Sequence, residues 1–307
     1  MPTYLIWILV AIVVLIVLYL ALGYHFGKKI VRPLHHDWEF LRDYEIEEGR
    51  LTLDRYKQVL PDEVHFASPH GEMLTGLWLP GIDPNHTVVL VHGIENNSIG
   101  MLKFAKPFQQ LGWNVFIFDQ RGNGRSGGRF ISYGWFERND LRAAYDWVLA
   151  RTSPDNQIGT LGMSMGATSA LMHAAIDPRV KFVVADSAYA DATDEILYQF
   201  HQQYKGIPEQ PLVPAGLAWA NLLGGFKLKD VNLLPLMPKL AMPVFFIHSL
   251  EDEVTPPANS QKLFFAKSNG ESELWMVPEA KHVRAINVIP DEYAARIHGF
   301  LKKNNLV

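Results

Sequence analysis

Hydrophobic and polar positions divide the chain into three stretches. The first, residues 4–22, is a run of nineteen residues without a charge. The second, residues 28–62, is charged and aromatic without a clear period, and from Glu63 onward short apolar runs alternate with amphipathic ones. As a helix, the first run would span about 28 Å, which matches the hydrocarbon core of a bilayer. We therefore predict a transmembrane helix in residues 1–27, a juxtamembrane spacer in residues 28–62 and a globular domain in residues 63–307.

Eight short apolar runs in this third stretch, rich in β-branched and aromatic residues, predict β-strands. They are residues 63–67, 73–80, 87–91, 114–118, 157–161, 181–185, 243–248 and 273–277. Apolar residues at helical spacing predict helices between the strands. These lie at residues 99–111, 136–151, 260–265 and 291–303, with one more directly after residue 164. The alternation predicts an α/β fold, a mainly parallel eight-stranded sheet with helices on both faces and an antiparallel hairpin at its start.

Residues 191–240 interrupt this alternation and predict a helical cap insertion. Apolar side chains dominate it, broken by prolines and by Gly224-Gly225. A cap over the strand ends would form an apolar acyl pocket and exclude water. The alternative is that these side chains simply pack on the core.

Three interpretations compete for the first apolar run. A cleaved signal peptide is disfavoured because no basic residue precedes the run, the run is too long and a small-residue cleavage pattern is poor. A buried core helix is disfavoured because the segment is apolar on all sides. We predict a single-pass membrane helix. Lys28, Lys29 and Arg32 follow it, so the positive-inside bias predicts that the domain lies on the cytoplasmic side of the cell membrane.

Composition excludes several classes of function. The net charge of -4, without long runs of like charge, gives no case for a nucleic-acid partner. The chain has no cysteine, which rules out disulfides, thiolate metal sites and a cysteine nucleophile. Its histidines show no metal-ligand spacing, so we predict no protein-bound catalytic metal. Nothing in the composition indicates an oligomeric state.

The pentapeptide Gly162-Met163-Ser164-Met165-Gly166 lies between a predicted buried strand and a predicted helix. Small residues on both sides of one serine permit the sharp turn of a nucleophile elbow, which lifts the hydroxyl clear of the sheet. By chance alone, such a pattern would occur in about one chain in ten of this length. Its place between strand and helix makes Ser164 the candidate nucleophile.

Two later strands end at residues suited to assist a serine. Asp252 follows the strand at residues 243–248, and His282 follows the strand at residues 273–277. In a doubly wound sheet, reactive groups collect at the carboxyl ends of the strands. The chain order Ser164, Asp252, His282 is the order of a serine hydrolase triad on this kind of sheet. Other carboxylates stay open as the acid: Glu251, Glu253 and Asp186.

The loops after two earlier strands carry the remaining candidate chemistry. After residues 87–91, a turn offers the backbone N–H of Ile94, or of a near neighbour, which would form an oxyanion hole with the N–H of Met165. His92 in this turn is interpreted as a structural hydrogen-bonding residue. The loop at residues 119–128 matches G-x-G-x-x-G, but no helix follows its third glycine, so we reject dinucleotide binding. Asp119 is interpreted as securing the Arg121 loop.

Together these residues resemble the α/β-hydrolases. The matching segments are Val91-His92-Gly93, Asp119 through Ser126, Gly162 through Gly166, Asp252 and His282. The chain is most similar to a bacterial membrane-anchored subgroup, often described only as α/β-hydrolase or as S33 serine aminopeptidase-like. The resemblance covers residues 63–304 and implies a serine nucleophile, a histidine base, an acidic orienting residue and no cofactor. The His-Gly-Gly-Gly motif of some esterase branches is absent from the sequence, which disfavours those branches.

The predicted function is hydrolysis of a carboxylic ester through an acyl-enzyme on Ser164. His282 would act as the base and Asp252 as the orienting residue. Membrane attachment and the apolar cap indicate a small-molecule acyl substrate, with lipid-like esters among the candidates. Two alternatives stay open, an aminopeptidase or acyltransferase on the same triad and a catalytically silent membrane-anchored binding protein.

Overall fold

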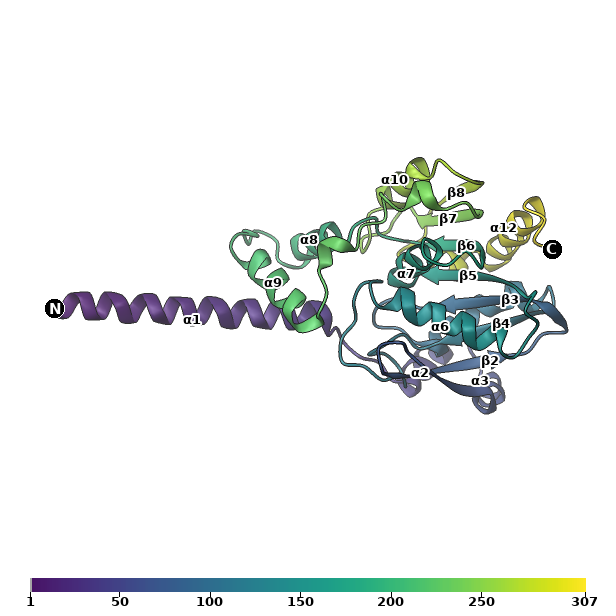
Figure 1. The fold of residues 1–307 in the computed structure, drawn as a ribbon, viewed down its shortest axis with the longest axis horizontal. Coiled ribbons are helices and arrows are strands. Elements are labelled where there is room, and N and C mark those ends of the chain that lie inside the picture. The colour runs from purple at the N-terminus through teal and green to yellow at the C-terminus, as the bar shows by residue number, and fades with distance from the viewer. Residues whose placement is uncertain (1) are drawn as a thin grey trace.

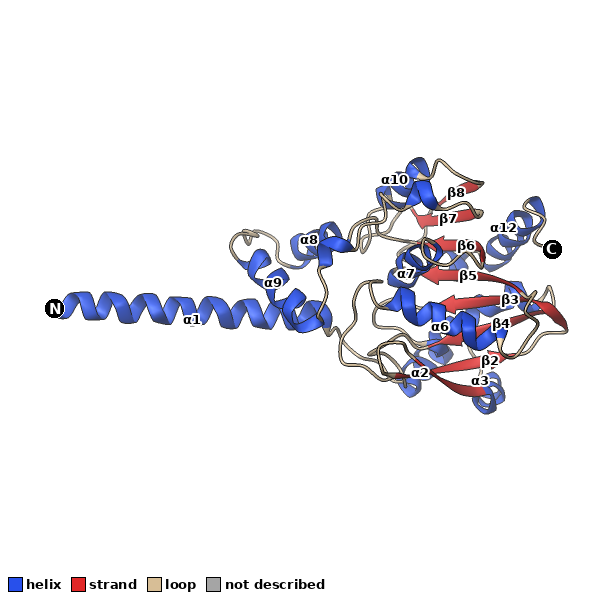
Figure 2. Ribbon diagram, in the orientation of Figure 1, coloured by secondary structure: helices blue, strands red, loops and turns tan. Residues whose placement is uncertain are grey.

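An eight-stranded sheet forms the centre of the protein (Figures 1 and 2), as the sequence predicts. The computed structural model describes residues 2–307. The strands lie in the order β1-β2-β4-β3-β5-β6-β7-β8, with β2 antiparallel to both its neighbours and all other pairs parallel. Their bounds are Glu63–Ala67, Met73–Leu79, Asp83–Val91, Trp113–Phe118, Gln157–Met163, Val180–Asp186, Val244–Ser249 and Ser272–Val277, from β1 to β8.

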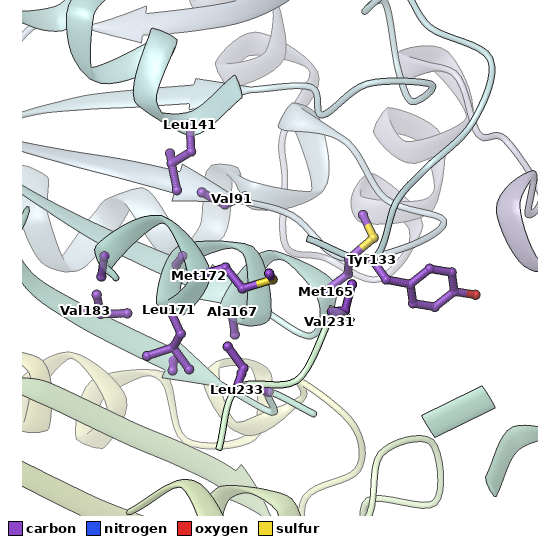
Figure 3. Close-up of a cluster of buried hydrophobic side chains, with 14 of the residues drawn as sticks. Val91, Tyr133, Leu141, Met165, Ala167, Leu171, Met172, Val183, Val231 and Leu233 are labelled. Atoms are coloured by element: carbon purple, nitrogen blue, oxygen red, sulfur yellow. The ribbon is translucent and has the colours of Figure 1, made fainter. Parts of the chain in front are cut away.

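Helices cover both faces of the sheet because successive side chains of each central strand point to opposite sides. On one face, Val89 and Val91 of β3 belong to a core with side chains of α6, α7 and α10, while Val88 and Leu90 belong to a second core with side chains of α5 and α12. These helices are α5 (Lys106–Gln109), α6 (Glu137–Leu149), α7 (Met165–Ala174), α10 (Ala258–Ala266) and α12 (Pro290–Lys303), with α11 (Ala285–Val288) before the last. Figure 3 shows α7 side chains such as Leu171 and Met172 within the first of these two cores.

The predicted helix at residues 99–111 is wrong as one continuous element. The segment is broken into α4 (Ser98–Met101), a 3₁₀ turn (Leu102–Ala105) and α5. Pro107 stands in the first turn of α5, where it has no backbone N–H for a helical hydrogen bond to the preceding turn. The other predicted strands and helices are confirmed with shifted ends, the largest shift being β3, which begins at Asp83 rather than Thr87.

A long helix, α1 (Thr3–Val31), projects from the domain (Figure 1). It extends four residues beyond the predicted end at residue 27. By length and apolar composition it is able to cross a membrane, a test that a signal sequence also passes. Its last turn is built into the domain, since Val31 is fully buried and its carbonyl accepts a hydrogen bond from Ile131 N at 2.9 Å.

The segment after α1 folds onto the domain as two short helices, α2 (Trp38–Glu47) and α3 (Leu53–Val59). The sequence predicts a spacer here. Trp38 is fully buried, and its Nε1 donates to the carboxylate of Asp119 at 2.7 Å. The segment is therefore part of the packed structure of the domain.

The predicted cap insertion leaves β6 and returns to β7. It contains α8 (Ala192–Gln203), α9 (Leu212–Gly224) and two 3₁₀ turns at Leu228–Asp230 and Met237–Lys239. Figure 2 shows α8 and α9 beyond the carboxyl ends of the parallel strands, on the side from which α1 projects. Several of its apolar residues, among them Val231 and Leu233, pack into the core beside α7 (Figure 3).

Candidate active site

Ser164 lies at the sharp turn between β5 and α7. Its backbone has φ 54° and ψ -123°, a conformation rarely adopted by residues other than glycine. Such strain is retained where the surroundings enforce it, and here the Ser164 N–H donates to the carbonyl of Asp186 on the neighbouring strand at 2.7 Å. The turn leaves the Ser164 side chain partly exposed at the carboxyl edge of the sheet.

The glycines that flank Ser164 are required by close backbone approach. A Cβ at Gly162 would lie 2.3 Å from the carbonyl oxygen of Gly166, and one at Gly166 would lie 2.1 Å from the carbonyl oxygen of Val91. Both distances are shorter than any real carbon–oxygen contact. The elbow therefore depends on both glycines, and this explains why the pentapeptide has a glycine on each side of Ser164.

Asp252 and His282 are in direct contact. The Nδ1 atom of His282 lies 2.7 Å from Oδ2 of Asp252, whose side chain is fully buried. The other carboxylate oxygen accepts the backbone N–H groups of Val254 and Thr255, at 2.9 and 2.8 Å. Burial alone would raise the pKa of Asp252, but its hydrogen bonds with His248 and His282 hold that pKa well below its usual range. The carboxylate therefore stays charged and fixes the Nδ1–H tautomer of His282.

Among residues 2–307, none of the alternative acids forms a hydrogen bond or ion pair with His282. Glu251 and Glu253 are exposed. Asp186 is buried, and it accepts hydrogen bonds from the Tyr293 and Ser187 hydroxyls, at 2.9 and 3.1 Å. Burial raises the pKa of Asp186. Of the four carboxylates that the sequence proposes, Asp252 is the one in contact with the histidine.

Sequence reasoning missed a second histidine at this carboxylate. His248, near the end of β7, is fully buried, with Nε2 3.2 Å from Oδ2 of Asp252 and 3.0 Å from the carbonyl oxygen of Thr255. Its Nδ1 lies 2.7 Å from the Ser260 hydroxyl. With Nε2 protonated, neutral His248 donates toward both oxygens and accepts from Ser260. The spacing of four residues between His248 and Asp252 is the signal that the sequence offered.

In the described part of the chain, the two backbone donors that the sequence assigns to an oxyanion hole, Ile94 and Met165, are unpaired. Within residues 2–307, neither the N–H of Ile94 nor that of Met165 has a hydrogen-bond acceptor. Met165 is the first residue of α7, where the helix dipole adds partial positive charge. In the same part of the chain, no hydrogen bond joins the Ser164 hydroxyl to His282. Catalytic hydrogen bonds of this kind often tighten only when substrate is bound.

His92 has the structural part that the sequence indicates. It is fully buried, accepts the Gln120 N–H at Nε2 at 2.8 Å, and has Nδ1 2.6 Å from the Gly93 carbonyl oxygen. Nδ1 therefore carries the proton, and burial lowers the pKa of the ring. Both nitrogens are occupied in holding the turn that presents Ile94.

Asp119 secures the Arg121 loop, as the sequence indicates. Its carboxylate accepts the N–H of Arg125, the N–H and hydroxyl of Ser98, and the Trp38 indole, all at 2.6–2.7 Å. The Arg121 guanidinium instead pairs with Asp140, at 2.6 Å. Asp119 thus joins the segment that follows α1 to the loops beside the candidate site.

Gly93 lies directly against Ser164. A Cβ at this position would be 3.0 Å from the Ser164 Cβ and 3.5 Å from its hydroxyl. We expect Gly93→Ala to lower kcat on an ester on the order of 10- to 100-fold, because the methyl group crowds the space that an acyl oxygen must enter. Steady-state kinetics measure this loss. The control is Gly299→Ala in α12, where nothing lies within 4 Å of the added Cβ, and equal activities of the two variants would contradict the prediction.

A cavity of about 350 Å³ opens beside His282, and its walls combine several charged side chains with a larger area of apolar surface. Its walls come from the elbow strand, from α2 and from the loops after β3, β7 and β8. The lining residues are Tyr44, Glu45, Asn96, Lys103, Met163, Glu251, Glu253, Val254, Lys281, His282, Val283 and Arg284. The cap, residues 191–240, does not contribute to this lining, so this cavity is not the acyl pocket expected from the cap.

In the described part of the chain, no group of three His, Asp or Glu side chains is placed to hold a metal ion.

The cap touches the acid loop through Glu195 of α8. Its Oε1 accepts the Thr255 hydroxyl at 3.1 Å, and Gln199 on the same helix donates to the Val254 carbonyl. Glu195 is 8% exposed, and among residues 2–307 its Oε2 has no hydrogen-bond partner. Burial raises the pKa of Glu195 to about 7. Sequence reasoning did not single out this residue, because an isolated glutamate on a helix is usually solvated.

We expect Glu195→Gln to flatten the pH dependence of stability. The pKa of Glu195 rises from 4.5 to about 7 on folding, so the folded protein holds a proton that the unfolded chain releases, and stability falls as the pH rises through this window. The loss amounts to about 3 kcal/mol above pH 7. Thermal unfolding at pH 5 and pH 8 measures it, with Asp194→Asn, an exposed neighbour, as the control. The same pH dependence in Glu195→Gln and wild type would refute the assignment.

Comparisons with known proteins agree with this architecture. A family model described as serine aminopeptidase, S33, matches residues 82–205, which is less than half of the chain. The uncharacterized protein YqkD of Bacillus subtilis is 29% identical over 97% of this chain and 98% of its own length. The uncharacterized protein YfhR of Salmonella typhi is 27% identical over 74% of this chain and 76% of its own.

Solved structures show the same likeness. The Pyrococcus furiosus esterase Pf2001 superposes with a TM-score of 0.65 and 28% identity, covering 78% of this chain and 90% of the esterase. DcsB, solved in complex with its substrate analogue, superposes with a TM-score of 0.61 at 18% identity, over 79% of this chain and 99% of its own. The chain belongs to the α/β-hydrolase superfamily. It is a hydrolase of that class.

Proposed function

We propose that this protein is a serine hydrolase that cleaves carboxylic esters through an acyl-enzyme on Ser164. The observation that carries the proposal is the buried Asp252 carboxylate 2.7 Å from His282 Nδ1, on loops that follow strands parallel to the one ending at Ser164. This arrangement supports a triad with Ser164 as nucleophile, His282 as base and Asp252 as the residue that orients His282.

In the proposed reaction, Nε2 of His282 accepts the Ser164 proton as the hydroxyl oxygen attacks the ester carbonyl carbon. The N–H groups of Ile94 and Met165 stabilise the oxyanion. The tetrahedral intermediate collapses, the alcohol leaves with the proton from His282, and the acyl group stays on Ser164. Water then attacks the acyl-enzyme with His282 as base and releases the carboxylic acid.

The choice of an ester rests on two supports. Pf2001, which is similar over most of the domain, is an esterase. An ester also requires less catalytic assistance than an amide, because its alcohol is the better leaving group.

A second candidate is an aminopeptidase, supported by the name of the matching family model and by the acidic side chains Glu251 and Glu253 in the cavity beside His282. Such carboxylates would suit a substrate ammonium group.

We also propose that α1 anchors the enzyme in the cell membrane as a single pass. Its apolar window has a mean hydropathy of 3.3 and none of it is buried by the rest of the protein. Its last turns contact the cap, since a Cβ at Gly27 would lie 2.5 Å from the Cβ of Trp219. Removal of the helix as a signal sequence would expose that contact, which supports its retention. The basic residues Lys28 and Lys29 in the last turn support a cytoplasmic domain.

The test combines a probe with a substrate panel. A fluorophosphonate should label the wild-type protein and the control Ser249→Ala, whose buried hydroxyl has no partner among residues 2–307, but not Ser164→Ala. Hydrolysis of acyl esters by the labelled enzyme supports the proposal. Cleavage of aminoacyl amides without esters would favour the aminopeptidase, and absence of labelling in every form would favour a silent binding protein.

A further inference from the structure

The cap and the N-terminal helix lie side by side over the last three turns of α1. The Tyr19 hydroxyl donates to the Pro211 carbonyl at 3.2 Å, and the Tyr24 and Trp219 rings meet edge to face with centroids 5.4 Å apart. Farther along, a Cβ at Gly224 would lie 3.4 Å from a methyl carbon of Val31. Both helices therefore run in the same direction, and α9 begins beside Tyr19, since Pro211 directly precedes it. Figure 1 shows α9 alongside the domain end of α1.

Small residues make this contact close. A Cβ at Gly27 would lie 2.8 Å from the carbonyl oxygen of Gly216, and one at Gly23 would lie 2.9 Å from the Cβ of Ala215. Gly23 and Gly27 are four residues apart, the spacing with which small residues let helix backbones approach each other in membranes. The position of the cap along α1 is thus fixed by packing.

This register sets the height of the cap relative to a bilayer. Tyr19 precedes Leu22, the last residue of the apolar run at residues 4–22, by three residues, which is about 4.5 Å along a helix. The turn between α8 and α9, residues 204–211, therefore reaches the boundary between hydrocarbon and headgroups if α1 crosses the membrane. Its composition suits that layer: Ile207 is 45% exposed, and Lys205 is exposed with no ion pair among residues 2–307.

The start of α9 continues the apolar surface. Residues 212–224 contain no charged side chain, and the exposed positions Pro214 and Ala218 lie on one face. We propose that residues 204–214, the cap tip, are a second membrane-contacting element, seated in the headgroup layer of the leaflet from which α1 emerges. The partner is the phospholipid surface, with Ile207 directed to acyl chains and Lys205 to phosphates. This inference rests on the proposed membrane anchor.

Seating the cap tip in the membrane turns the candidate site toward lipid. Since α1 and the cap both lie at the carboxyl edge of the sheet (Figure 2), Ser164 and His282 belong to the edge that faces the bilayer. An ester held in the leaflet would reach the site without crossing bulk water. The proposed substrate class thereby narrows to acyl esters that reside in membranes.

The absence of cysteine from the sequence allows a clean test by single-cysteine spin labelling of the full chain in phospholipid vesicles. The informative variant is Ile207→Cys. Leu15→Cys, 65% exposed on α1, reports the bilayer, and Ile82→Cys, 93% exposed at the amino end of β3, reports water. Relaxation by oxygen and by a water-soluble nickel chelate gives the depth of each label.

We expect the nickel accessibility of the Ile207→Cys label to be several-fold below that of Ile82→Cys, and its oxygen accessibility to lie between the two controls. A label at position 207 as accessible to nickel as that at position 82, while position 15 is protected, would overturn the inference and leave the anchor intact. Exposure of position 15 to nickel would instead show that α1 is not in the bilayer, and the anchor and the inference would fall together.

Discussion

Ser164→Ala is expected to lower kcat for the best ester substrate on the order of 10⁵- to 10⁶-fold, without loss of fold. The alanine removes the atom that forms the acyl-enzyme, while the free N–H groups of Ile94 and Met165 remain. A residual acceleration of about 10³-fold over the uncatalysed reaction should persist, since oxyanion stabilisation and binding survive loss of the nucleophile. Initial rates at saturating substrate measure both quantities.

Ser249→Ala provides the matched control for this experiment. Ser249 ends β7, is fully buried, and its hydroxyl lacks a partner among residues 2–307. Removing that hydroxyl leaves no broken hydrogen bond, so activity and thermal stability should stay near those of the wild type. If Ser164→Ala retained more than about one tenth of the wild-type kcat, the acyl-enzyme mechanism would be wrong.

Asp252→Asn is expected to lower kcat by about 10⁴-fold. The asparagine keeps the shape of the side chain but offers an N–H where His282 Nδ1 now has a carboxylate oxygen at 2.7 Å. The imidazole would then present the wrong tautomer to Ser164, and its charged form would lose its counter-ion. Single-turnover acylation rates measure the loss directly.

Glu253→Gln is the control for the charge. Glu253 lies one residue from Asp252 and is exposed, so its neutralisation should change kcat by less than about threefold. Equal effects of the two substitutions on kcat would show that Asp252 does not orient His282.

The Asp252 carboxylate also contributes to the pH dependence of stability. Because the folded-state pKa of Asp252 is lowered, the stability that this carboxylate contributes is present above the usual carboxyl pKa near 4 and is lost only as the pH falls well below it.

The sheet was predictable because its signal is local. A strand covered on both faces is a short apolar run wherever it occurs, and the strands at Val91, Met163 and Asp186 each stand out as such a run. Once the order of strands is known, the carboxyl ends lie together, so Ser164, Asp252 and His282 follow from the order of the chain. The contact between Asp252 and His282 agrees with that derivation.

The contacts that sequence reasoning missed are long-range ones. Glu195 contacts Thr255 from the cap, and α9 packs on α1 from nearly 200 residues away, as the hydrogen bond from Tyr19 to Pro211 shows. Neither of these pairings leaves a periodic pattern in a single sequence. The broken helix near Pro107 has a different cause. The apolar residues there have helical spacing, but Pro107 has no backbone N–H to continue the helix.

The burial of Trp38 sets the smallest fragment that can be studied in solution. A fragment beginning at Glu63 would match the boundary that sequence pattern alone suggests, yet it would lack the indole that donates to Asp119. Removing such a fully buried tryptophan costs about 3–5 kcal/mol, comparable to the whole stability of many proteins. A fragment for expression should therefore begin at Ile30 or earlier. The Ile30 carbonyl accepts the Tyr133 hydroxyl at 3.0 Å.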